Sequence, residues 1–249
     1  MEILPKLVNL HRSGLQDVLL LLPQGMARFT EVITRLLDRM QVRATLAFEP
    51  WVRMIRVQDI AYFGPVSRHN DRKSETLLAF RDEVRTALGV VPSPRRRFYI
   101  DRPESLPRSL SNAAEVRAVM EANGYETVEP GGLSFAGQVA LLSQASHIAG
   151  PLGAGLTNML WAPKECRVTM FDPGLHDLFF WDLAALAGQP FTWVFAAPLA
   201  HFSQELASGR YALDVGLLRV ALAAQDDPQP EDDTLADQTF LEPFPILDD

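Results

Sequence analysis

The spacing of apolar residues takes two forms along most of the chain. Short apolar runs, typical of buried strands, are separated by stretches with an apolar residue every three or four positions, typical of helices packed on a sheet. The runs predict strands at residues 17–22, 54–63, 97–100, 125–128, 147–149, 168–171 and 191–195. The longer period predicts helices at residues 25–40, 74–88, 112–122, 135–143, from a turn at 150–155 to about 161, 177–187 and 213–224. Strands separated by helices indicate parallel β-α-β units.

Two blocks of this pattern meet at a segment rich in proline and arginine. Residues 91–96 carry Pro92 and Pro94, and an arginine run follows at residues 95–97. Prolines in this setting indicate a linker, and the arginines are expected to form a solvated face. The sequence therefore predicts an α/β fold of two Rossmann-like domains, residues 1–94 and 95–224, followed by a tail at 225–249.

Charge separates the tail from the rest of the chain. Residues 225–249 contain nine acids and no Lys or Arg, which predicts disorder. Without the tail, the body has 23 basic and 22 acidic residues, so it lacks the broad basic field of a nucleic-acid-binding protein.

The longest apolar run, Val18–Leu22, is too short to span a bilayer, and no signal peptide is visible. We expect a cytoplasmic protein, and its one cysteine, Cys166, allows no internal disulfide.

The glycine-rich stretch at residues 150–158 carries the most informative chemistry. It follows an expected strand and opens an expected helix. Small residues let backbone N–H groups approach an anion, and a helix N-terminus carries partial positive charge. In an open α/β sheet, ligands bind at the carboxyl ends of strands. The stretch therefore predicts an anion site, although a tight turn whose glycines serve packing alone would give the same pattern.

A second segment with ligand chemistry, residues 100–112, follows another expected strand. Its Arg102 and Arg108 carry planar guanidinium groups, which bind a diphosphate through paired hydrogen bonds. The alternative is that both are solvated loop arginines. No Asp-x-Asp motif occurs in residues 1–224, and the five histidines show no metal-ligand spacing. We therefore expect no metal, and each histidine is expected to lie on the surface or to have its hydrogen bonds satisfied.

Taken in order, these motifs resemble the nucleotide-sugar-binding half of glycosyltransferase family 61, over residues 97 to about 198. The family pattern has a strand ending in Ser-Arg, an Arg before an Asn-Glu helix start, a Gly-aromatic strand, a Leu-Ser-x-x-x-Gln helix and Gly-x-His-Gly-Ala-Gly-Leu-Thr-Asn. The matching residues are Asp101-Arg102, Arg108, Asn112 with Glu115, Gly124-Tyr125, Leu133-Ser134 with Gln138, and residues 150–158. Residues 2–7 resemble the end of the family's His-Trp-x-x-Glu-x-Leu-Pro-Arg-Leu segment.

The resemblance implies a fold, a reaction and a set of site residues. It implies two domains facing a cleft (the GT-B arrangement) and an inverting, metal-independent transfer without a cofactor. The donor would be a nucleotide sugar, usually UDP-linked, and the acceptor a glycan in polysaccharide biosynthesis. Carried over to this sequence, the motifs imply donor binding by Arg102, Arg108, Asn112, Gly150, Gly153, Ala154, Gly155, Thr157 and Asn158. Glu2 is the matched acid in the first domain and is the candidate general base.

Two departures from the family pattern bear on activity. Leu152 stands where the family has His, and leucine can neither donate to phosphate nor relay a proton. The chain begins inside the first motif, so we expect a truncated N-terminal domain whose apolar faces, at Leu19–Leu22 and in the helix at residues 26–40, promote self-association. Two alternatives to an active transferase therefore stay open. One is an inactive nucleotide-sugar-binding or partner-binding remnant, and the other is an interaction domain with no ligand.

Overall fold

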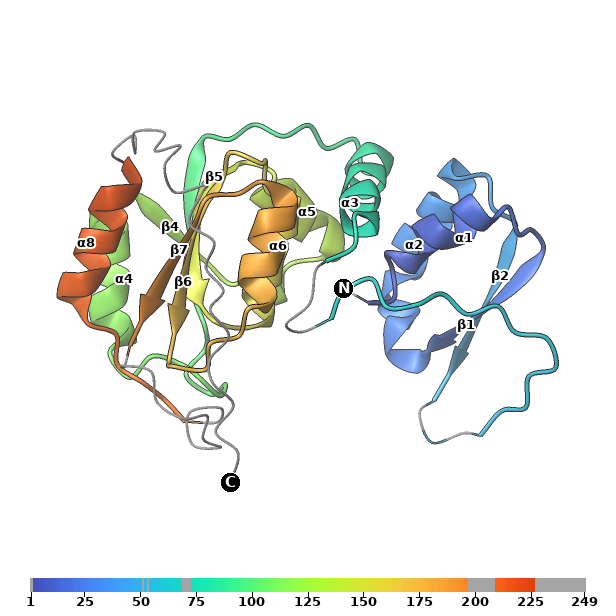
Figure 1. Cartoon of the computed structure of the whole chain (residues 1–249), viewed down its shortest axis with the longest axis horizontal. Coiled ribbons are helices and arrows are strands. Elements are labelled where there is room, and N and C mark those ends of the chain that lie inside the picture. The colour runs from blue at the N-terminus through green and yellow to red at the C-terminus, as the bar shows by residue number, and fades with distance from the viewer. Residues whose placement is uncertain (1, 51, 53, 69–72, 197–208, 227–249) are drawn as a thin grey trace, which may run out of the picture.

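A computed structural model of the chain describes residues 2–50, 52, 54–68, 73–196 and 209–226. Helices and parallel strands alternate along it, as the sequence predicts (Figure 1). The earlier elements are α1 (Lys6–Ser13), β1 (Val18–Pro23), η1 (Gln24–Phe29), α2 (Thr30–Arg39), β2 (Ala44–Glu49) and α3 (Thr76–Ala87). The later elements are β3 (Arg96–Ile100), α4 (Ala113–Ala122), β4 (Tyr125–Val128), η2 (Pro130–Gly132), α5 (Phe135–Leu142), β5 (Ala145–Pro151), η3 (Ala154–Trp161), β6 (Arg167–Asp172), α6 (Phe179–Ala187), β7 (Phe191–Phe195) and α8 (Val215–Asp226).

The first lobe, from α1 to β2, is a small parallel sheet with helices beside it. β1 and β2 pair in parallel along their whole length, and α1 and α2 lie on one side of them (Figure 1). The apolar stripe of α2 is buried, as its period predicts. On β1, Leu19 and Leu21 remain exposed, at 64% and 43%.

The strand predicted at residues 54–63 is wrong. These residues form no strand, and β2, at residues 44–49, is the partner of β1 instead. Met54 is 98% exposed, and Ile60 and Tyr62 are each 75% exposed. Apolar, β-branched residues favour a strand only where a neighbouring strand and a covering layer are present, and this segment has neither.

The second lobe, from β3 to α8, is a five-stranded parallel sheet covered on both faces. The strand order is β4-β3-β5-β6-β7. Figure 1 shows α5 and α6 on one face and α4 and α8 on the other. The order reverses between β3 and β5, so the carboxyl ends of these two strands form a topological switch point, where open α/β sheets bind ligands.

Aromatic packing joins the two lobes. Phe29, at the end of η1, makes an edge-to-face contact with Phe135 at the start of α5, with ring centroids 5.6 Å apart. Trp161 lies 5.4 Å from Phe135 and 5.8 Å from Phe80 of α3. Arg85 of α3 donates from Nη2 to the Trp161 carbonyl oxygen at 2.6 Å. α3 thus packs between the lobes, and the division at residues 94/95 and the cleft of a GT-B arrangement stay predictions.

The starts and types of the helices agree only in part with the sequence pattern. Ser134 caps α5, because its Oγ accepts a hydrogen bond from the Gly137 N–H at 3.1 Å. Asn112 stands at the start of α4 but does not cap it. The helix predicted at residues 25–40 divides into the 3-10 helix η1 and the α-helix α2. The predicted helix after the glycine turn is also a 3-10 helix, η3, and β5 continues as far as Pro151.

The arginine run is not the solvated linker face that its sequence predicts. Arg96 and Arg97 open β3, where Arg96 pairs with Glu126 of β4 at 2.5 Å and Arg97 pairs with Asp226 of α8 at 2.8 Å. Asp226 therefore belongs to the last helix, so α8 runs two residues into the segment that the sequence predicts as a tail. The rest of the predicted tail, residues 227–249, lies outside the described residues.

Candidate functional site

Two positions at the switch point require glycine, because the backbone there lies in close contact with the end of β3. A Cβ atom on Gly150 would lie 2.7 Å from the carbonyl oxygen of Ile100, the last residue of β3. A Cβ atom on Gly155 would lie 3.0 Å from Cγ2 of Ile100. Both glycines therefore let β5 and η3 lie directly against the end of β3.

Gly153 makes room for an arginine side chain. A Cβ atom on Gly153 would overlap Nη1 of Arg102, so the guanidinium group lies directly over this glycine. Gly153 has an extended backbone, with φ 164°, so space and not conformation requires a glycine here. Arg102 is held in place because its Nε donates to the Pro107 carbonyl oxygen at 2.6 Å and its N–H donates to Asp101 Oδ1 at 2.8 Å. The structure thus brings together two of the predicted donor-binding residues.

Arg108 is held near Arg102 in an unusual conformation. Its backbone is left-handed, with φ 61°, and its N–H donates to the Gly209 carbonyl oxygen at 2.8 Å. Its Nε is buried and has no hydrogen-bond partner within the described ranges of the chain. Burial and the positive charge of Arg108 lower the pKa of Arg102, which reports the proximity of the two groups. Among the described residues, neither arginine has a carboxylate within ion-pair distance, so an anion would fit between them.

Tyr211 completes this cluster, and sequence reasoning missed it. Its hydroxyl donates to the Phe171 carbonyl oxygen at 3.1 Å, and the same oxygen accepts a hydrogen bond from the Leu152 N–H at 2.8 Å. Burial raises the pKa of Tyr211, whereas Arg102 and Arg108 oppose that shift. The phenol therefore stays protonated beside the two arginines.

The other predicted donor-binding residues have structural partners. Thr157 donates from Oγ1 to the Ala154 carbonyl oxygen at 2.6 Å, and Asn158 donates from Nδ2 to the Gly155 carbonyl oxygen at 3.0 Å. Both bonds therefore stabilise η3 from within. The Asn112 side chain binds both backbone groups of Leu213, at 2.9 and 3.0 Å, and donates to Glu115 at 3.2 Å. Asn112 thus ties the start of α4 to the segment before α8, and ligand binding by these residues stays a prediction.

Leu152 is a core residue. It is 2% exposed and belongs to the apolar cluster that runs under α5 and α6. At this position the family pattern has a histidine. The leucine side chain is therefore turned into the core and offers no polar group to the switch point.

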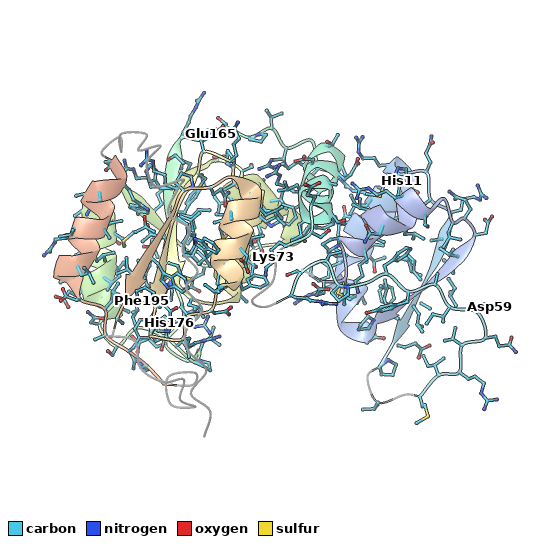
Figure 2. All side chains as sticks on the ribbon, in the orientation of Figure 1. His11, Asp59, Lys73, Glu165, His176 and Phe195 are labelled. Atoms are coloured by element: carbon cyan, nitrogen blue, oxygen red, sulfur yellow. The ribbon has the colours of Figure 1, made fainter. Side chains whose placement is uncertain are left out.

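Glu2 precedes α1 and contacts the segment that leads toward α3. Its Oε2 accepts a hydrogen bond from the Val66 N–H at 3.3 Å, and its Oε1 is buried without a hydrogen-bond partner among the described residues. The Val66 carbonyl oxygen accepts from Ser74, next to Lys73. Lys73 then reaches α6, with its Nζ 3.3 Å from Asp182 Oδ2 (Figure 2). Contacts thus lead from Glu2 to α6, whereas no described contact joins Glu2 to the two switch-point arginines.

The remaining candidate groups have ordinary surroundings. The described residues contain no group of three His, Cys, Asp or Glu side chains that could hold a metal ion. Cys166 is buried, and burial raises the pKa of its thiol. In the same part of the chain, no helix is long and apolar enough to cross a membrane.

The family follows from a comparison with known protein families. The model of the family described as Glycosyltransferase 61 matches residues 1–169, more than half of the chain. The chain belongs to glycosyltransferase family 61. The match covers Glu2, Arg102, Arg108 and the glycine-rich stretch, and it ends within β6. Membership in family 61 implies glycosyltransferase activity in general, with a donor and an acceptor as substrates. A search of the curated proteins found no match to this chain.

Proposed function

We propose that this family 61 member is a cytoplasmic glycosyltransferase of polysaccharide biosynthesis. It moves a sugar from a nucleotide-sugar donor, UDP-linked, to a hydroxyl group of a glycan acceptor, with inversion and without a metal ion. The supporting observation is the pair Arg102 and Arg108, which lies at the switch point without a carboxylate partner among the described residues. A diphosphate is the anion that matches two adjacent guanidinium groups at such a position.

The arginine pair would act on the leaving group. When the bond between the anomeric carbon and the diphosphate oxygen breaks, negative charge grows on the diphosphate. Arg102 and Arg108 are already in place to neutralise it, so little reorganisation is needed at the moment of reaction. Gly153 leaves the space that the Arg102 guanidinium group fills, because it has no side chain.

The acceptor hydroxyl needs a base on the opposite side of the sugar. In a single displacement the hydroxyl oxygen attacks the anomeric carbon, its proton passes to the base, and the diphosphate leaves with the bonding electron pair. Glu2 is the candidate base because its Oε1 has no hydrogen-bond partner in the part of the chain that the structure describes and can accept that proton. The role requires the acceptor to bring its hydroxyl group to the segment that holds Glu2.

Binding calorimetry tests the donor site. UDP is titrated into the wild-type chain and into the Arg102→Ala and Arg108→Ala variants, each with and without EDTA. A charge-assisted hydrogen bond contributes about 1.5–3 kcal/mol, so each variant should bind UDP about ten- to a hundredfold more weakly. Arg96→Ala is the control, because Arg96 is paired with Glu126 at the other end of β3. Loss of binding in EDTA would contradict the metal-independent site.

Turnover of the donor tests the base. A panel of UDP-sugars is incubated with glycan acceptors, and release of UDP is measured for the wild type and for Glu2→Gln. The variant should lower kcat by about 10²–10⁴-fold and leave the affinity for UDP unchanged. An unchanged kcat would show that the base lies elsewhere.

Leu152 favours a second candidate function, an inactive nucleotide-sugar-binding protein. The family histidine is replaced by a side chain that is buried in the core and has no polar group. Such a protein would bind UDP at the same site and would turn over no donor in the panel. Binding with no turnover would therefore decide for the second candidate.

A further inference from the structure

A buried carboxylate organises the carboxyl ends of β6 and β7. Asp172 is the last residue of β6, is fully buried and lies in register with Phe195, the last residue of β7. Its carboxylate accepts four hydrogen bonds, from the backbone N–H groups of Gly174 (2.8 Å), Leu175 (2.7 Å) and His176 (3.1 Å) and from Nε1 of Trp193 (3.0 Å). Because one group binds both the loop and the indole ring, it fixes them relative to each other.

His176, Trp193 and Phe195 form an aromatic cluster at this edge of the sheet. The Trp193 and Phe195 rings stack with centroids 5.0 Å apart and planes at 23°, and the His176 ring lies 5.0 Å from Phe195. Figure 2 shows His176 and Phe195 together at the end of the strands. All three side chains are only half-buried, so each ring keeps some accessible surface.

His176 has two features that packing alone does not explain. Its backbone is left-handed, with φ 51°, which is uncommon for a histidine. Its Nε2 is buried and has no hydrogen-bond partner in the described part of the chain. A buried polar atom without a partner costs free energy, and such atoms are rare unless they serve a function. The loop that Asp172 holds therefore positions an imidazole whose Nε2 has no partner among the described residues.

The cluster lies at a suitable distance from the switch point. Gly153 follows β5, and Phe195 ends β7, two strands further along the sheet. Neighbouring strands lie about 4.8 Å apart, so the two positions are separated by roughly 10 Å along the edge. An extended nucleotide with its diphosphate at Gly153 and Arg102 would bring its base to the cluster.

We propose that His176, Trp193 and Phe195 form the nucleobase subsite of the donor site. The proposal rests on the proposed function, since it requires a nucleotide diphosphate at Arg102 and Arg108. The base packs against the aromatic rings, and the polar edge of the base makes a hydrogen bond with His176 Nε2. All three residues lie beyond residue 169, where the family match ends.

Two probes separate the base from the diphosphate. UDP carries both groups, whereas inorganic pyrophosphate carries only the phosphates. Calorimetry measures both probes on the wild type, His176→Asn, Phe195→Leu and Arg102→Ala. Asparagine suits the left-handed backbone at residue 176 and removes the imidazole ring. We expect His176→Asn and Phe195→Leu to weaken UDP binding at least tenfold and to leave pyrophosphate binding unchanged, whereas Arg102→Ala weakens both.

Fluorescence provides a second readout that does not depend on a variant at residue 176. UDP should quench tryptophan emission, pyrophosphate should not, and Trp193→Phe should abolish the UDP-dependent quenching. Trp181→Phe is the matched control, because Trp181 lies half-exposed on α6. Trp181→Phe should retain the quenching.

The outcomes distinguish the subsite from the proposed function. If the wild type binds UDP and both His176→Asn and Phe195→Leu bind it equally well, the subsite is wrong and the diphosphate site stands. If the wild type binds neither UDP nor pyrophosphate, the proposed function fails and the subsite falls with it. If His176→Asn loses its fold, Phe195→Leu and the fluorescence of Trp193→Phe decide.

Discussion

Replacing Gly153 by alanine should weaken UDP binding through Arg102 and leave the fold intact. The new methyl group would occupy the space of Arg102 Nη1, so the guanidinium group must move. Alanine adopts the extended backbone at this position without strain, because φ is 164°. Losing one charge-assisted hydrogen bond to phosphate costs about 1.5–3 kcal/mol. The dissociation constant for UDP should therefore rise about ten- to a hundredfold.

Two other glycines are controls for this substitution. Gly131→Ala should change nothing, since no atom lies within 4 Å of its Cβ position. Gly150→Ala should destabilise the chain by about 1–3 kcal/mol, because its Cβ would meet the backbone oxygen of Ile100 at 2.7 Å. Calorimetry with UDP and thermal unfolding followed by circular dichroism measure the two effects separately.

A double-mutant cycle makes the argument refutable. If the methyl group at residue 153 acts by displacing Arg102, it has no further effect when Arg102 is already alanine. Gly153→Ala in the Arg102→Ala background should then bind UDP as weakly as Arg102→Ala alone. Wild-type affinity in Gly153→Ala, or fully additive losses in the double variant, would refute the reasoning.

Three further predictions concern stability and association. Leu152→His should lower the melting temperature in thermal unfolding without improving UDP affinity, because it removes about 1.5–3 kcal/mol of apolar burial and buries an imidazole in the core. His147 is kept neutral, since burial and the charge of Arg97 lower its pKa to about 4. As the pH is lowered, the unfolded chain therefore takes up a proton on His147 at a higher pH than the folded chain does. The free energy of unfolding in urea should fall by about 2–3 kcal/mol between pH 6.5 and pH 4 for this reason, and His147→Gln should lack this fall. The exposed Leu19 on β1 should promote self-association, which Leu19→Glu should reduce in sedimentation velocity runs.

The sequence predicts the second lobe better than the first for a physical reason. Strands of a parallel sheet covered on both faces are continuous apolar runs, so β3, β6 and β7 are visible in the pattern. In the first lobe, β2 is short and only half-buried, whereas the segment at residues 54–63 is richer in strand-forming residues but has no partner strand. Composition therefore pointed to the wrong segment.

The sequence also predicts only some of the residues of the candidate site. Arg102 and Gly153 each follow a predicted strand, and a parallel topology brings the carboxyl ends of strands to one edge, so their proximity is predictable. Tyr211 reaches the same place from a non-helical segment, through backbone hydrogen bonds with Ser109 and Ser111 and a hydroxyl bond to Phe171, which no periodicity reveals. His176 is a single histidine in a loop, and only the structure shows its unpartnered nitrogen.

A crystal structure of the chain with UDP tests the central claim most directly. The account predicts diphosphate oxygens about 3 Å from the guanidinium groups of both Arg102 and Arg108, with the diphosphate against the backbone of Gly153. A nucleotide bound away from the ends of β3 and β5, or one held by a metal ion bridged to carboxylates, would contradict it.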